Sequence, residues 1–209
     1  MSVGDTQLLL EEKQRLRERG KRARAALSPA QRRAFSAAVC RALMEHPAFQ
    51  MARRVMSYAA FGAELSLDDL RELAPDKEFF YPRCLPERQM EALRPLSDDG
   101  WSVGAYGIRT PVPERSQSIH PAELDLVLVP LVAYDRQCRR LGMGGGYYDR
   151  FLPRCTLAVK LGVAFSCQEA ERVPAGEYDV PLDGVVTERG RRAAAGNRPA
   201  GLIRDDGGE

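Results

Sequence analysis

The feature that most constrains the fold is an almost continuous apolar run, L-D-L-V-L-V-P-L-V, at residues 124–132. The run is short and is bounded by polar segments, as expected of a β-strand. Because its apolar residues do not alternate with polar ones, we expect a central strand that is buried on both faces. Loops that leave such strands carry function in open α/β sheets, so the residues that follow the run are candidates for a site.

Two helices are predicted at the beginning of the chain. Residues 7–27 are rich in Leu, Glu, Arg and Ala and predict a long basic helix, in which Gly20 costs about 1 kcal/mol relative to Ala. Ser28 is a good N-cap, Pro29 suits the first turn, and Gln31 completes a capping box. A second helix therefore follows directly.

After these helices, short apolar runs alternate with helical segments. The predicted strands cover residues 54–60, 78–81, 90–93 and 157–165. Ser66 is expected to cap a short helix that carries Leu67, Leu70 and Leu73, and another helix should follow the glycines at residues 142–146. This alternation favours an α/β fold built in layers.

Composition limits the domain organisation. The chain has 209 residues, of which 44% are hydrophobic and 29% charged, so it is long enough to bury a substantial core. We expect one domain over residues 1–190. Residues 191–209 are small, polar and rich in glycine, which predicts a flexible tail.

Several classes of protein are disfavoured. The first residues contain no basic segment before an apolar one, and Leu8–Leu10 is too short to cross a membrane, so we expect a cytoplasmic protein with no membrane partner. The five cysteines show no C-x-x-C spacing, and there are only two histidines. Neither a disulfide framework nor a zinc site is therefore expected.

The segment R-R-L-G-M-G-G-G-Y-Y-D-R-F-L, at residues 139–152, contains the main candidate site. The order strand, glycine loop, helix lets backbone N–H groups approach a phosphate without obstruction by Cβ atoms. The loop is not a Walker A motif, since no G-K-[ST] follows, and it does not match G-x-G-x-x-G. From the loop alone, a flexible turn with packed tyrosines and a surface carboxylate at Asp149 remains an alternative.

This loop, R-L-G-x-G-x-G-Y-Y-D, resembles that of the 5-formyltetrahydrofolate cyclo-ligase family. The likeness extends from Lys13 to about Glu188. Its other motifs are K-x-x-x-R at Lys13 and Arg17, Ser36, Y-x-x-F-x-x-E-L at Tyr58–Leu65, F-Y-P-R at Phe80–Arg83, G-I-x-x-P at Gly107–Pro111, and V-P…D…D-x-V-V-T-E at Val173–Glu188.

The resemblance implies a three-layer α/β sandwich with a central mixed, mostly parallel sheet flanked by helices. It also implies an ATP- and Mg²⁺-dependent cyclisation of 5-formyltetrahydrofolate to 5,10-methenyltetrahydrofolate, which releases ADP and phosphate after phosphorylation of the formyl oxygen. Phosphoryl transfer of this kind depends mainly on positioning and charge neutralisation, so arginines, backbone amides and a carboxylate-held Mg²⁺ suffice.

The resemblance also assigns residues to roles. The ATP-binding residues are Lys13, Arg17, Arg140, Gly142, Met143, Gly144, Gly145, Gly146, Tyr147 and Tyr148. The catalytic residues are Arg140, Tyr147 and Asp149. The substrate-binding residues are Glu64, Tyr147 and Tyr148, with Tyr58, Phe61 and Met90 as candidates for the pocket wall, for which the hydrophobic core is the alternative. The Mg²⁺ carboxylates are Asp149 and Asp183, with Asp179 as the alternative to Asp183.

Lys13 and Arg17 share a helix face because they lie four residues apart. Arg15, Arg19, Lys21, Arg22 and Arg24 are expected to form a solvated basic face. The chain departs from the family at Arg109-Thr110, where an acidic or amide residue is expected, and at Gly145, where some members carry a basic residue. These departures affect the predicted shape of the folate pocket and the number of charges on the phosphates.

Other functions remain open at this stage. Similar folds host sugar-phosphate isomerases and CoA transferases, because a fold does not determine a function. A nucleic-acid-binding module that uses the basic helix is disfavoured by the overall balance of 31 basic and 29 acidic residues. We expect a monomer with ATP and 5-formyltetrahydrofolate as its partners and no nucleic acid.

Overall fold

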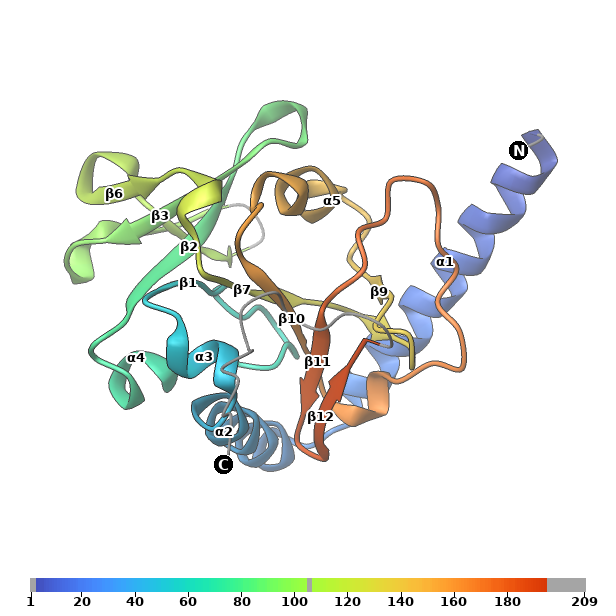
Figure 1. Cartoon of the computed structure of the whole chain (residues 1–209). Helices are drawn as coiled ribbons and strands as arrows, with labels where there is room; N and C mark the ends of the chain where they lie inside the picture. Colours follow the sequence, from blue (N-terminus) through green and yellow to red (C-terminus); the bar gives the residue numbers. More distant parts are fainter. Residues whose placement is uncertain (1–2, 105–106, 195–209) are drawn as a thin grey trace, which may run out of the picture.

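The computed structural model describes residues 3–104 and 107–194 (Figure 1). The helices are α1 (Val3–Ala25), α2 (Pro29–Met44), α3 (Pro47–Met51), α4 (Leu70–Leu73) and α5 (Tyr147–Phe151). The strands are β1 (Arg54–Met56), β2 (Glu78–Cys84), β3 (Met90–Pro95), β4 (Trp101–Val103), β5 (Arg109–Pro111), β6 (Ser116–Ile119), β7 (Leu126–Pro130), β8 (Ala133–Tyr134), β9 (Arg140–Leu141), β10 (Val159–Val163), β11 (Gly184–Thr187) and β12 (Gly190–Ala193).

Within the described residues, eight strands form one sheet in the order β12-β11-β10-β7-β1-β2-β3-β6. The five strands β11, β10, β7, β1 and β2 are parallel to one another, whereas β12, β3 and β6 pair antiparallel at the two sides of this group. The pairs β4-β5 and β8-β9 form two small separate sheets. The expectation of a mixed, mostly parallel sheet is confirmed.

The central strand β7 contributes to two hydrophobic cores, one on each face of the sheet. Leu126 and Leu128 belong to the core beneath α2, α3 and α4, whereas Val127 and Val129 belong to the core that includes Phe151 of α5. These four residues are fully buried. The run at residues 124–132 therefore has the two-sided burial that its lack of alternation predicts, and the layers lie as expected of a three-layer sandwich (Figure 1).

The beginning of the chain follows the predicted helices closely. Ser28 caps α2 through a complete capping box with Gln31, which confirms the boundary between α1 and α2. The helix predicted after Ser66 is a single turn, α4. The Ser66 hydroxyl accepts a hydrogen bond from the Asp68 N–H at 3.2 Å, in the turn before that helix.

The predicted domain boundary needs a correction at the C-terminal end. Residues 190–193 form β12, which pairs with β11 along its whole length, so the sheet includes positions that were expected to belong to a tail. All four residues of β11 are buried, whereas β12 is exposed throughout, which explains why its sequence does not look like a strand. Residues 195–209 lie outside the described residues.

Candidate active site

Helix α1 borders the carboxyl ends of the parallel strands, where the predicted site residues gather (Figure 1). Its inward face is formed by Lys13, Leu16, Arg17, Gly20 and Arg24, spaced so that all lie on one side of the helix. A Cβ atom at Gly20 would lie 2.2 Å from the carbonyl oxygen of Val132, directly after β7. Glycine therefore allows α1 to approach the central strand, which compensates for its low helix propensity.

The glycine loop adopts a conformation that requires glycine at two positions. Gly144 has φ +103° and Gly146 has φ +71°, both in the left-handed region. The Arg17 Nε donates a hydrogen bond to the Gly142 carbonyl at 3.0 Å, and the guanidinium packs against Gly144. The structure thus brings Arg17 to the loop, as predicted.

Arg140 connects the loop to α5. Its side chain is only 4% exposed, and its Nη2 donates to the Asp149 carboxylate at 2.5 Å. The guanidinium carbon lies 5.8 Å from the centre of the Tyr148 ring. The Nε of Arg140 is buried and has no hydrogen-bond partner among the described residues, so one donor of this buried cation is unused.

Lys13 pairs with Asp179 rather than with the loop. The Lys13 ammonium donates to the Asp179 carboxylate, which also accepts the Gly176 N–H at 2.7 Å. Burial lowers the pKa of Arg17, while the negative charges of Asp179 and Asp149 oppose that shift. Basic and acidic side chains therefore alternate beside the glycine loop, and both carboxylates affect the same guanidinium.

Asp183 and Asp149, the two carboxylates expected to hold Mg²⁺, lie in different elements: Asp149 is in the first turn of α5, and Asp183 directly precedes β11. Helix α1, which contacts the glycine loop, borders the carboxyl ends of the parallel strands. Asp183 lies at their amino-terminal ends, just before β11. Its carboxylate accepts the Lys160 N–H at 2.7 Å, at the start of β10. Asp125 makes the same kind of bond to the N–H of Arg54 at 2.7 Å. These aspartates satisfy strand N–H groups, and sequence spacing alone does not distinguish that role from metal binding.

Glu64 lies in the loop after β1 and is held from two directions. One carboxylate oxygen accepts the Phe61 N–H at 3.1 Å, and the other lies 3.5 Å from the Arg24 guanidinium. Tyr58 is buried, and its hydroxyl donates to the Leu65 carbonyl at 2.6 Å. Tyr58 thus fixes the loop, while the Phe61 side chain is 42% exposed.

Tyr148 links this loop to the glycine loop. Its ring is half-buried, but its hydroxyl is buried and has no hydrogen-bond partner among the described residues. Burial raises the pKa of Tyr148 well above the usual value, and the Glu64 charge adds to the increase, while Arg140 opposes it. The same influences reach Tyr58, whose pKa is raised by burial and then by Glu64. The two predicted subsites are therefore neighbours.

Met90 is a wall residue of a cavity of about 350 Å³, which Gln89, Arg150, Phe151 and Arg154 also line. Its side chain is 3% exposed and belongs to the core of the α5 face. The departure from the family at Gly145 also has a local cause. A Cβ atom there would lie 2.9 Å from the Tyr147 ring, so a larger residue would require that ring to move.

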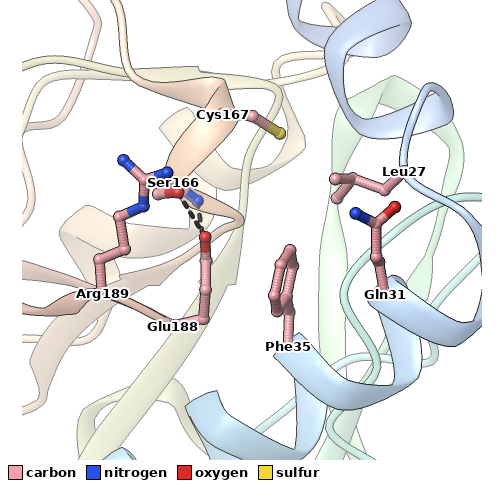
Figure 2. Close-up of a pocket in the computed structure, with 7 residues that line it drawn as sticks. All are labelled: Leu27, Gln31, Phe35, Ser166, Cys167, Glu188 and Arg189. Atoms are coloured by element: carbon pink, nitrogen blue, oxygen red, sulfur yellow. Dashed lines mark hydrogen bonds between the residues drawn. The ribbon is translucent and has the colours of Figure 1, made fainter.

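A second cavity, of about 440 Å³, lies between the α1-α2 connection and the ends of β10 and β11 (Figure 2). None of the predicted site residues lines it. Glu188 points toward Ser166, which donates to it from both its N–H and its hydroxyl group. Burial and the Glu188 charge raise the pKa of the adjacent Cys167 thiol, which disfavours a reactive thiolate. This cavity is separate from the candidate site.

Sequence reasoning missed Arg24, which it placed on a solvated face. Arg24 is 7% exposed, whereas Arg15, Arg19, Lys21 and Arg22 are exposed as expected. The helical spacing of Arg24 with Lys13, Arg17 and Gly20 is the signal that could have revealed it.

The buried arginines, the glycine loop and the paired carboxylates are those of an α/β enzyme that acts on a phosphate-bearing substrate. The model of the 5-formyltetrahydrofolate cyclo-ligase family matches residues 10–188, and the chain belongs to this family.

Known relatives agree with this assignment. The chain is similar to the 5-formyltetrahydrofolate cyclo-ligase of Escherichia coli K12, with 31% identity over 172 residues that cover 78% of this chain and 93% of the relative. The mouse 5-formyltetrahydrofolate cyclo-ligase is 27% identical over 87% of this chain and 92% of its own length. The solved structure of Aquifex aeolicus 5,10-methenyltetrahydrofolate synthetase superimposes with a TM-score of 0.78 at 34% identity, covering 94% of this chain and 99% of that chain.

No helix among the described residues has the length and apolar character needed to cross a membrane.

Proposed function

We propose that the chain uses ATP to close 5-formyltetrahydrofolate into 5,10-methenyltetrahydrofolate, with ADP and phosphate as the other products. The family match supports the reaction, and one structural observation supports its location: charged pairs of opposite sign surround a glycine loop that adjoins Glu64 and Tyr148. The family match also disfavours the alternatives of a sugar-phosphate isomerase and a CoA transferase.

The phosphates of ATP would lie over the glycine loop, at residues 142–146. The backbone N–H groups of the loop would face the phosphate oxygens, because Gly144 and Gly146 have no Cβ atom to obstruct them and adopt positive φ. Arg17 and Arg140 would neutralise negative charge from one side, and Lys13 from the other. Arg140 is suited to this role because it is already buried and has an unused Nε donor.

The residues near the loop fit a Mg²⁺ ion, which would come with ATP. Asp149 and Asp179 would hold it, with the remaining ligands from phosphate and water, as is usual for Mg²⁺. In the structure, Asp149 forms an ion pair with Arg140, and Asp179 forms one with Lys13. Binding would exchange these partners, because the cations gain phosphate oxygens when the carboxylates gain the metal. When bound, Mg²⁺ offsets the charge that develops on the transferred phosphoryl group.

The pterin end of the folate would bind at Glu64, whose carboxylate can accept paired hydrogen bonds from ring N–H groups. Tyr147 and Tyr148 would contact the flat substrate from the side of the glycine loop, and Tyr148 offers a free hydroxyl donor. Phe61 and Met90 would contribute apolar surface. Tyr58 acts on the substrate through the loop, because its hydroxyl is committed to Leu65.

This geometry supports a reaction in two steps. The formyl oxygen attacks the γ-phosphorus, and the bond to the ADP oxygen breaks. N10 then attacks the activated formyl carbon, and the C–O bond to the phosphate breaks as the ring closes, while N10 loses its proton. Arg140 and Arg17 stabilise charge on the phosphoryl group, and Glu64 with Tyr148 keeps the folate oriented.

A direct assay tests this proposal. Purified protein with ATP, Mg²⁺ and 5-formyltetrahydrofolate should produce the near-ultraviolet absorbance of the methenyl product. Omission of either ATP or Mg²⁺ should abolish it. A folded sample with no turnover under any of these conditions would refute the assignment. We also propose a cytoplasmic monomer, which cell fractionation and size-exclusion chromatography test.

A further inference from the structure

Arg24 is a buried cation that the site described so far does not use. It lies in the last turn of α1, its side chain is 8% exposed, and Glu64 is its ion-pair partner at 3.5 Å. Among the described residues, no other acidic group pairs with it. The cation is therefore directed at the carboxylate proposed to bind the pterin.

Few groups are placed to orient the Glu64 carboxylate. The Phe61 N–H holds one carboxylate oxygen, and Arg24 faces the other. The hydroxyl of Tyr58 is already used by Leu65, so it does not hold the carboxylate. Arg24 is thus the group that holds the second carboxylate oxygen of Glu64 in position.

Stability alone does not explain this ion pair. Removing two charges from water costs several kcal/mol per ion before their attraction is counted, and buried pairs are often no better for stability than apolar side chains of similar volume. The 3.5 Å separation is also longer than that of a strong charge-assisted hydrogen bond. A functional requirement for a fixed carboxylate accounts for the pair.

We propose that Arg24 is a positioning residue, which orients Glu64 for folate binding. This inference rests on the proposed role of Glu64. Arg24 also lies on the same helix face as Arg17, about 10 Å further along the axis at 1.5 Å per residue. One rigid helix thereby fixes the spacing between the folate and phosphate ends of the site.

The test is a double-mutant cycle of Arg24→Gln and Glu64→Gln, in which KM for each substrate is measured separately. Arg24→Gln should raise the KM for 5-formyltetrahydrofolate by about tenfold, as expected for loss of an oriented charged contact, and leave the KM for ATP unchanged. The double variant should be no worse than Glu64→Gln alone, because Arg24 acts through that carboxylate. Arg22→Gln is the matched control, since Arg22 is exposed and lies two residues before Arg24 in the same helix, and it should match the parent protein.

The outcomes separate this inference from the proposed function. A normal folate KM in Glu64→Gln would remove Glu64 from the site. A raised folate KM there, combined with independent and additive effects of Arg24→Gln, would overturn the positioning role alone. An equal rise of both KM values in Arg24→Gln would do the same, because a general loosening of α1 affects both ends. If Arg24→Gln does not fold, Arg24→Lys replaces it: the shorter side chain should raise folate KM about threefold, and an unchanged value would overturn the inference.

Discussion

The middle of α1 contacts the glycine loop and its last turn contacts the loop after β1, and the two contacts differ in kind. Lys13 and Arg17 lie beside a glycine loop and two partly exposed carboxylates, whose side chains are 27% and 28% exposed. Arg24 faces one carboxylate, Glu64, and both side chains are nearly buried. On the proposed function, the phosphate end near the glycine loop would exchange its ion-pair partners when ATP binds, whereas the folate end near Glu64 would be held in one arrangement. We infer that substrate binding would redistribute charge at the phosphate end, whereas the geometry of the folate end is fixed before the substrate binds.

The largest expected effect is at the phosphate end. Asp149→Asn keeps the side-chain shape but removes the negative charge that a hard cation prefers. We expect turnover at low Mg²⁺ to fall on the order of 100-fold, corresponding to about 3 kcal/mol of lost charge stabilisation, and to recover partly at high Mg²⁺. Mg²⁺-dependent rates and thermal melting should be measured on the same sample.

The alternative, in which Asp149 has no role in metal binding, makes the opposite prediction. If Asp149 is only a surface carboxylate in a first helical turn, its replacement by Asn would lower the stability by at most about 1 kcal/mol and leave catalysis intact. Because Arg140 would lose a charged partner, some loss of stability is expected in either case. The Mg²⁺ curve is therefore the measurement that decides, and an unchanged curve would exclude Asp149 from the metal site.

The second prediction concerns Arg17, which donates a hydrogen bond to the Gly142 carbonyl of the loop. Arg17→Ala should raise the KM for ATP roughly 10- to 100-fold, because a charge-assisted contact to phosphate contributes about 1.5–3 kcal/mol. Folate KM should change little. Arg22→Ala is the control on an exposed position of the same helix. Equal effects from the two variants would mean that α1 attracts ATP only through a diffuse basic surface.

The glycine loop could be recognised in the sequence, whereas the surroundings of Glu64 could not, for a physical reason. A glycine loop between a strand and a helix is a local pattern, so residues 142–146 could be recognised from neighbours in the chain. The Arg24–Glu64 pair joins residues 40 positions apart, and nothing local distinguishes a buried arginine from four exposed basic residues beside it. Only the packing of α1 against Val132, which Gly20 permits, selects its inward face.

The same distinction applies to the fold. Strand β7 could be predicted because both of its faces are apolar, and α2 because its capping box is contained within four residues. The edge strand β12 is exposed throughout and carries no such pattern. Asp179 and Asp183 illustrate the limit most clearly: both follow Val173 in the matching motif, but tertiary structure sends one to Lys13 and the other to the start of β10.

The third prediction uses the contact that lies between the two ends. Gly20→Ala places a Cβ atom against the Val132 carbonyl, so α1 must shift. Overpacking should cost about 1–3 kcal/mol, reduced by about 1 kcal/mol because alanine favours helix. We expect a lower melting temperature and a moderate rise in KM for both ATP and folate. A change in only one KM value would show that the two ends are not held by a common helix.

The smallest expected effect is at Tyr148, where the two ends meet. Its buried hydroxyl has no partner in the described part of the chain, so Tyr148→Phe removes a desolvated donor and should leave stability unchanged or raise it by up to about 1 kcal/mol. If the hydroxyl donates to bound substrate, the same variant should still raise folate KM by roughly threefold, as expected for one modest hydrogen bond.

The pH dependence of stability gives a further check on Tyr148. Burial and then Glu64 raise the pKa of Tyr148 above the ordinary 10.0, so the unfolded chain releases this proton first, and the parent protein should lose stability as pH rises past 10.0. Tyr148→Phe should lose less over that range. Denaturant titrations of both proteins at pH 8 and above 10, alongside the two KM values, would test the assignment; a variant with lower stability at pH 8 would show that the hydroxyl has a structural partner in the folded protein.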